Sequence, residues 1–210
     1  MDKSVLWKLS YGMYAIGTLD DERPTGCIVN TVVQITSVGD PIIALSMNKD
    51  NFTYEAIKAT GKFAVSILSE KTNQNVIAKL GFSSGRDTDK FEGFDFMYFD
   101  AMPIVKENVC GYVAADVLSM QETQTHFVIL AQVSNAMKGI DFPPMTYQYY
   151  HDVIKGKAPK NAPTYREEVA KERYVCDVCG YVYEGDLAAQ PEDFVCPICK
   201  HPKSHLKKQG

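Results

Sequence analysis

Two C-x-x-C pairs near the end of the chain constrain its fold more than any other feature. Cys176 and Cys179 form the first pair, Cys196 and Cys199 form the second, and 16 residues separate them. Each pair offers two sulfur atoms to one side of a tight turn, so two pairs can build a tetrahedral thiolate cage for Zn²⁺ or iron. The alternative is a pair of disulfides, which suits secreted proteins, and nothing in this sequence indicates secretion. The four cysteines therefore predict a metal site.

Aromatic residues surround the two pairs. They are Tyr174, Tyr181, Tyr183 and Phe194. A small domain held together by a metal shields its centre with a few large side chains. With these residues, with Gly180 after the first pair and with Pro197 inside the second, residues 173–205 resemble rubredoxins. Rubredoxins hold one iron in four thiolates and transfer single electrons, so the resemblance favours iron, whereas the cysteine pattern alone also permits a structural zinc ribbon.

Two departures from the rubredoxin pattern stand out. The loop between the knuckles is shorter than in free-standing rubredoxins and is similar to the version fused to rubrerythrins. Lys200 stands where the family has glycine, in a turn whose amide points at sulfur. A left-handed backbone at Lys200 would be strained because lysine has a Cβ. If the second knuckle donates poorly to sulfur, we expect a lowered iron potential.

The overall composition is that of a soluble globular protein. Hydrophobic residues make up 45% of the 210 residues and charged residues 23%. The net charge of −4 gives no electrostatic footprint for nucleic acid. The sequence has neither an apolar signal core nor an apolar run of membrane-spanning length, so we expect a cytoplasmic protein with reduced thiols and no membrane partner. Cys27 and Cys110 are then most simply small buried hydrophobic residues.

The region before residue 155 reads as short strands with two helices inserted. Strands are expected over residues 8–18, 27–37, 42–47, 63–68, 109–119 and 126–136. Asn51 and Thr53 can cap a helix over residues 54–59, and a second helix is expected over residues 73–80 with Gly81 as its C-cap. This mainly β pattern with short helices predicts a small closed barrel. The missing βαβ rhythm and the missing G-x-G-x-x-G motif argue against a Rossmann nucleotide site.

Composition also divides the chain. Residues 155–172 are polar and contain Gly156, Pro159 and Pro163, as a linker does. We therefore predict a barrel domain over residues 1–154, a linker over residues 155–172 and a metal-knuckle domain over residues 173–210.

Three segments of the barrel could carry chemistry: residues 30–32, 46–53 and 81–91. Helix N-termini and Ser/Gly turns expose N–H groups, and Lys49, Arg86 and Lys90 could neutralise a phosphate. Each segment also has a plain structural interpretation, respectively a locally hydrogen-bonded strand, a helix cap, and a C-cap with an exposed charged turn. The residues taken alone favour these structural interpretations.

The same segments, taken in order over residues 4–150, resemble the flavin reductase family with its FMN-binding split β-barrel. The matching motifs are Tyr11-Gly12, Asn30-Thr31, Asn51-x-Thr53, residues 61–69 (GKFAVSILS), residues 84–91 (SGRDxDKF) and His126. The family binds FMN between two subunits, so the resemblance implies FMN, NAD(P)H as co-substrate and a homodimer. It implies cofactor contacts from Asn30, Thr31, Ser46, Met47, Asn48, Lys49, Asn51, Thr53, Phe82, Ser83, Ser84, Gly85, Arg86 and Lys90. His126 matches the family's histidine near the flavin and is the candidate catalytic residue; its alternative is a locally hydrogen-bonded strand histidine.

The barrel and the knuckle domain together are similar to the high-molecular-weight rubredoxins of anaerobes. This resemblance implies a converter: NAD(P)H reduces FMN by two electrons, and the flavin passes them singly to the chain's own iron. It also implies an external acceptor of the flavodiiron type, which reduces O₂ or NO. Two alternatives stay open, namely a flavin or ferric reductase whose zinc ribbon only docks a partner, and a non-enzymatic barrel with a zinc-ribbon interaction module. No motif separates NADH from NADPH.

Overall fold

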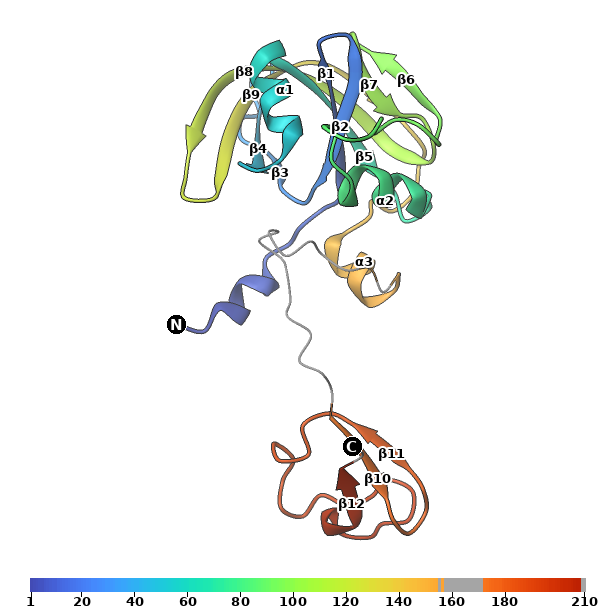
Figure 1. The fold of residues 1–210 in the computed structure, drawn as a ribbon. Helices are drawn as coiled ribbons and strands as arrows, with labels where there is room; N and C mark the ends of the chain where they lie inside the picture. Colours follow the sequence, from blue (N-terminus) through green and yellow to red (C-terminus); the bar gives the residue numbers. More distant parts are fainter. Residues whose placement is uncertain (155, 157–171, 209–210) are drawn as a thin grey trace. The chain divides into compact units, whose positions relative to one another are not determined.

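The computed structural model describes residues 1–154, 156 and 172–208, and the chain falls into two compact units, Met1–Tyr165 and Arg166–Gly210 (Figure 1). The predicted linker over residues 155–172 lies almost entirely outside the described residues. Its extent and the two domain limits beside it therefore stay predictions. Among the helices of the described part, none is long and apolar enough to cross a membrane.

The first unit is built on a seven-stranded sheet with the order β2-β1-β5-β8-β9-β4-β3. The strands are β1 (Tyr14–Asp20), β2 (Arg23–Val29), β3 (Val32–Gln34), β4 (Ile42–Asn48), β5 (Lys62–Leu68), β8 (Val109–Glu122) and β9 (His126–Lys138). Neighbouring strands are antiparallel throughout. The end strands β2 and β3 are joined by only Asn30 and Thr31, so the two sheet edges approach within roughly 11 Å at that corner. The sheet therefore curls into a barrel split between β2 and β3, which confirms the predicted fold class.

The unit also has elements outside this sheet. They are η1 (Lys3–Lys8), α1 (Phe52–Thr60), α2 (Gln74–Phe82), β6 (Phe96–Phe99), β7 (Met102–Val105) and α3 (Tyr147–Asp152). Strands β6 and β7 pair as a separate hairpin.

Two hydrophobic cores hold the unit together. Alternate residues of the strands, such as Ile43, Leu45 and Met47 of β4, point into the barrel, where Ile57 of α1 joins them. Because successive strand residues face opposite sides, the other face of β1 and β5 is also apolar and packs against α2 and β7. Burying one such side chain contributes about 1.5–3 kcal/mol.

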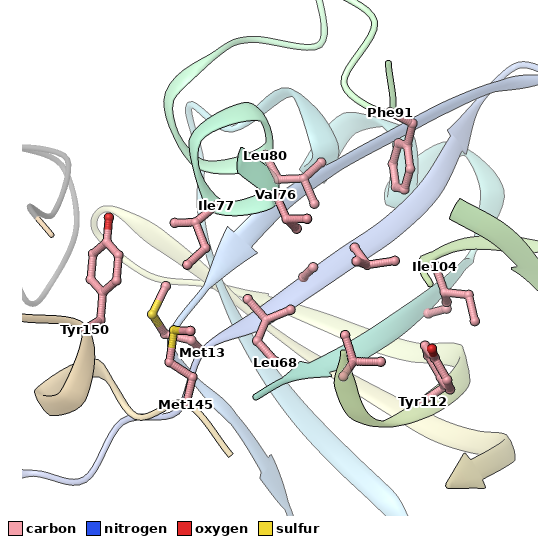
Figure 2. Packing of buried hydrophobic residues seen from close by; sticks show 14 of the residues in the cluster. Met13, Leu68, Val76, Ile77, Leu80, Phe91, Ile104, Tyr112, Met145 and Tyr150 are labelled. Carbon is pink, nitrogen blue, oxygen red and sulfur yellow. The ribbon is translucent and has the colours of Figure 1, made fainter. Parts of the chain in front are cut away.

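The second core is visible in close-up. Figure 2 shows Val76, Ile77 and Leu80 on one side of α2, with Met13, just before β1, and Leu68 of β5 beyond them. All five are nearly fully buried. This packing, together with the contacts of α2 with β2, fixes α2 on the barrel and so fixes the turn that follows it.

Local capping explains where the helices start and stop. The Asn51 side chain accepts a hydrogen bond from Thr53 N over 3.1 Å and begins α1, and Gly61 ends it with a φ of 68°. The predicted C-cap of α2, Gly81, lies inside the helix instead, which ends at Phe82. A tertiary contact explains the difference. The Lys90 ammonium donates to the Leu80 carbonyl over 2.9 Å, so this carbonyl in the last turn of α2 has a hydrogen-bond donor without a left-handed glycine.

Some strand predictions were wrong in detail. The expected strand over residues 8–18 includes the end of η1 and begins only at Tyr14, and the expected strand over residues 27–37 is broken between β2 and β3. The sequence predictions also missed the β6–β7 hairpin and α3. All four residues of β7 are buried, so they carry no alternating pattern by which the strand could be predicted.

The second unit is a small three-stranded sheet around the cysteines. Its elements are β10 (Arg173–Cys176), β11 (Val182–Glu184), η2 (Lys203–His205) and β12 (Leu206–Lys208), with the strand order β11-β10-β12. Leu187 and Leu206 share its core with two of the cysteines. The aromatic residues expected to shield the centre pack there: Tyr174, Tyr181, Tyr183 and Phe194.

Candidate functional site

The four cysteines of the second unit converge on one point. Their sulfur atoms all lie within 4.8 Å of one another. The Sγ atoms of Cys176 and Cys199 are 3.6 Å apart, as are those of Cys179 and Cys196. A tetrahedron with metal–sulfur bonds of about 2.3 Å has sulfur–sulfur edges of about 3.8 Å. The cage therefore fits one tetrahedral ion.

The two knuckles share the same backbone geometry. Gly180 has a φ of 72° and Lys200 a φ of 59°, so both residues are left-handed. Gly180 N donates to the Cys176 carbonyl and Lys200 N to the Cys196 carbonyl, each over 2.9 Å. The strained conformation expected at Lys200 is thus present, and the turn closes around it as it does around glycine.

Both knuckles also donate amides to sulfur. The N–H of Tyr181 bonds to the Cys179 sulfur, and the N–H of His201 bonds in the same way to the Cys199 sulfur. Hydrogen bonds from the backbone N–H groups of Cys199 and Ile198 lower the pKa of Cys196 to about 6. The concern that Lys200 would cost the second knuckle these hydrogen bonds does not hold in this geometry.

A cavity of about 370 Å³ opens in the first unit between β2, the start of α1 and the turn after α2. It brings together residues from all three segments singled out in the sequence. The predicted residues that line it are Asn30, Ser46, Asn48, Asn51, Thr53, Phe82, Ser83, Ser84, Gly85, Lys90 and His126.

Four predicted residues are absent from the lining of this cavity. Met47 is buried in the barrel core, and Thr31 donates to Asn30 Oδ1 over 3.0 Å. Lys49 pairs with Glu122. The fourth, Arg86, holds its guanidinium 5.2 Å from the centre of the Phe52 ring. Their contacts with a cofactor stay predictions.

Other lining residues were not predicted. The apolar and aromatic part of the wall includes Met13, Ile28, Ile77, Tyr147 and Tyr150. Burial raises the pKa of the Tyr150 hydroxyl, so it stays protonated well above neutral pH. No motif marks these residues, because an apolar side chain facing a cavity has the same sequence signature as one in the core.

Lys90 is a buried charged residue that lines the cavity. Its side chain lies at the C-terminus of α2, where it donates to the carbonyls of Leu80 and Ser83. A cation is favoured there by the helix dipole. Burial lowers the Lys90 pKa, which the nearby Cys27 partly offsets. An ammonium has three N–H donors, so one remains beyond these two carbonyls for a group in the cavity.

The two remaining cysteines differ in environment. Cys27 lines the cavity and is buried, and this burial raises its pKa to about 11 despite hydrogen bonds with Thr53 and Asn51. Its thiol is neutral and unreactive at neutral pH, in keeping with the buried role predicted for it. Cys110 is only half-buried, with its sulfur 3.3 Å from the Phe142 carbonyl.

His126 also lines the cavity. It pairs with Asn48 across β4 and β9, and its Nδ1 lies 2.8 Å from Thr125 Oγ1. Burial lowers its pKa, so the imidazole is neutral at neutral pH. Thr125 thus holds the ring in place, and the uncharged imidazole lies where it can exchange a hydrogen bond with a group in the cavity.

The cavity suits a flavin in size and in the kinds of groups that line it. The lining combines amide and hydroxyl groups with apolar and aromatic groups, and it includes one ammonium, that of Lys90. Ligand sites of this size are mostly apolar with a few polar groups that fix orientation. The residues present therefore fit a tricyclic ring with a hydroxylated, anionic chain.

The chain thus combines a split barrel that has such a cavity with a four-cysteine knuckle domain, which is the architecture of a two-domain oxidoreductase. The flavin reductase like domain family matches residues 6–154, and the rubrerythrin, rubredoxin-like domain family matches residues 174–207. The chain belongs to the flavin reductase like domain family and carries a rubredoxin-like domain at its C-terminal end. The resemblances expected from the sequence are confirmed, including the rubrerythrin type of the knuckle loop.

Relatives extend over one or both parts of the chain. The chain is 37% identical to the high molecular weight rubredoxin of Moorella thermoacetica over 95% of this chain and 96% of that protein. It is 33% identical to a ferric-chelate reductase (NAD(P)H) of Archaeoglobus fulgidus over 80% of this chain and 99% of that protein.

Solved structures agree with the fold of the first unit. Nitrilotriacetate monooxygenase component B from Mycobacterium thermoresistibile is 27% identical, with a TM-score of 0.59 over 68% of this chain and 76% of that one. A flavin reductase domain protein from Arthrobacter has a TM-score of 0.61 over 69% of this chain and 87% of that one. At 20% identity the second comparison shows the fold alone.

Proposed function

We propose that this protein is an NAD(P)H-dependent FMN oxidoreductase that passes electrons from the flavin to its own rubredoxin-like iron and on to an acceptor protein. One observation carries the proposal: a flavin-sized cavity and a four-thiol metal cage occur in the same chain. The relative named high molecular weight rubredoxin matches along nearly the whole length of both proteins, which supports this combination of activities.

The cavity residues divide into two groups in this proposal. Asn30, Ser46 and Asn48 would meet the polar edge of the isoalloxazine ring, and Asn51 and Thr53 the ribityl chain. The turn after α2, which consists of Ser83, Ser84, Gly85 and Arg86, would take the phosphate. Lys90 would add a positive charge beside this turn, because its ammonium is already fixed there by the carbonyls of Leu80 and Ser83.

His126 would form a hydrogen bond beside the isoalloxazine ring. A neutral imidazole can accept or donate a hydrogen bond without bringing a charge that would compete with the phosphate site. Thr125 would keep the ring oriented through its contact with Nδ1. The apolar wall would exclude water and leave a surface for the nicotinamide; either NADH or NADPH is compatible with these residues.

The four cysteines would hold one iron. A bound flavin accepts two electrons from a reduced nicotinamide, and iron in four thiolates carries one electron at a time. The amide donors to Cys179, Cys196 and Cys199 stabilise anionic sulfur, and the aromatic shell limits water around it.

Two copies of the chain would share each flavin, as in the family. Thr31 and Lys49 lie off the cavity of a single chain, and a second copy could bring such residues to it. Val33 of the end strand β3 and Ile35, just after that strand, are both exposed, which supports a face buried between copies. The acceptor would be a protein of the flavodiiron type that reduces O₂ or NO in the cytoplasm.

The variant Cys196→Ser tests the electron path. It removes one iron ligand and leaves the first unit unchanged, so NADH-dependent reduction of a flavodiiron acceptor should stop while reduction of the bound flavin continues. The conservative control is Cys110→Ser, a cysteine outside the cage. If Cys196→Ser reduced the acceptor as fast as the unmodified chain, the proposed path through the metal would be wrong.

A second candidate is a flavin or ferric reductase whose second unit holds zinc and only docks a partner. The similarity to a ferric-chelate reductase over nearly all of that protein favours it. The metal and the free-flavin activity separate the two functions. Iron in the isolated protein, with acceptor reduction lost in Cys196→Ser, supports the electron path. Zinc in the isolated protein, with reduction of free flavin or ferric chelate unchanged after removal of residues 166–210, supports the second candidate.

A further inference from the structure

The turn over residues 83–86 is held from outside the cavity by β2. Arg23 donates through Nη2 to the Gly85 carbonyl over 2.8 Å and to Asp20 Oδ2 over 2.7 Å. Arg23 itself does not line the cavity, whereas Gly85 does. This single guanidinium therefore connects the β1–β2 turn to the turn proposed to take the phosphate.

Close packing around Gly85 also holds this turn in place. A Cβ added to Gly85 would lie 2.5 Å from Thr25 Oγ1 and 2.7 Å from Phe52 Cδ1. Thr25 lies two residues after Arg23 on β2, so both residues face the same side of the strand. Gly85 is thus clamped between β2, the first residue of α1 and the Arg23 side chain.

This clamp sets the orientation of the peptide between Gly85 and Arg86. All described peptide bonds are trans, so a carbonyl facing Arg23 directs the Arg86 N–H to the opposite side. There the N–H donates to Ser84 Oγ over 3.2 Å. The Ser84 oxygen is then an acceptor within the turn, and its hydroxyl proton is left to donate to a ligand in the cavity that Ser84 lines.

We propose that Arg23 is a positioning residue that sets the preference of the cavity for a phosphorylated flavin. The inference rests on the proposed function, in which the turn takes the FMN phosphate. Without Arg23 the Gly85 carbonyl is free to rotate toward the cavity. Its partial negative charge would then repel a phosphate, and the Ser84 hydroxyl would lose its fixed orientation. The affinity for a ligand without the phosphate would not be affected by this change.

The test compares FMN with riboflavin, which has the same ring and ribityl chain but no phosphate. The full-length protein is stripped of flavin and titrated with each ligand. Arg23→Met should bind FMN roughly tenfold more weakly, about 1.4 kcal/mol, while riboflavin affinity changes by less than about twofold. Arg23→Lys should recover part of the FMN affinity, because an ammonium can still donate to the carbonyl. The control Asp20→Asn removes the ion pair but keeps the bond to Gly85, and should retain the preference.

Two results would overturn the inference. One is an unchanged FMN affinity in Arg23→Met, and the other is an equal loss for both flavins, as a merely structural role would give. A separate outcome concerns the proposed function itself. If the unmodified chain bound FMN and riboflavin equally, the phosphate site would be wrong, and the role of Arg23 would fall with it.

Discussion

Replacement of Lys200 by glycine isolates the strain in the second metal knuckle. Lys200 has a φ of 59°, in the region where residues with a Cβ are disfavoured. The matching position of the first knuckle, Gly180, has a φ of 72°, and a Cβ added there would meet no atom within 4 Å. Lys200→Gly should therefore relieve strain, and Gly180→Ala should introduce it without a clash.

The magnitude follows from two opposing terms. A left-handed conformation costs a residue with a Cβ about 1–2 kcal/mol. The greater freedom of glycine in the unfolded chain offsets about 0.5–1 kcal/mol of the gain. Lys200→Gly should thus raise the free energy of unfolding of the second unit by about 0.5–1 kcal/mol, and Gly180→Ala should lower it by a similar amount.

The assay is denaturant-induced metal release from the full-length, metal-loaded protein. Lys200→Ala is the matched control, because it removes the charge and keeps the left-handed Cβ, so it should leave the stability unchanged. The reduction potentials of Lys200→Gly and Lys200→Ala should agree, because the amide of His201 reaches the Cys199 sulfur in the existing geometry. Equal stability of these two variants, or a higher potential in the glycine variant alone, would refute the reasoning.

Three further predictions concern the first unit. Lys90→Met leaves the carbonyls of Leu80 and Ser83 without their donor and should lower the free energy of unfolding by about 2–3 kcal/mol in urea; an effect below about 0.5 kcal/mol would show that water replaces the ammonium. Gly85→Ala forces the turn away from β2 and should weaken FMN binding while the fold, followed by circular dichroism, is kept. His126 has a folded pKa below its unfolded value of about 6.5, so the unfolded state takes up its proton first and the protein loses stability as the pH falls below about 6.5. His126→Gln should therefore flatten this acid limb and change nothing at pH values above it; an identical pH dependence in the variant would contradict the assignment.

The metal site was predictable because its ligands are local. Each C-x-x-C pair forms its knuckle within a few residues, so the spacing alone indicates the cage. Even the left-handed turn at Lys200 could be anticipated, because rubredoxins have glycine at the matching position. Its consequence could not, because the retained amide at His201 depends on how the whole turn closes.

The cavity was predictable only in its polar half. Residues such as Asn51 and Ser84 belong to motifs whose order along the chain indicates a flavin site. Tyr147 and Tyr150 belong to α3, a six-residue helix with no long periodic pattern. The cap that Lys90 gives α2 joins residues ten positions apart through a tertiary contact, so sequence reasoning assigned that end to Gly81 instead. Contacts of this kind are decided by packing, which no local pattern contains.

The central claim is that electrons from a nicotinamide reach the metal through the flavin of the same protein. The direct measurement is an anaerobic titration of the full-length protein with NADH, in which the flavin and iron–thiolate absorption bands are followed separately. Both bands should bleach, with uptake of about three electrons per chain, and Cys196→Ser should take up only about two. Complete bleaching of the flavin with an unchanged iron band would contradict the account.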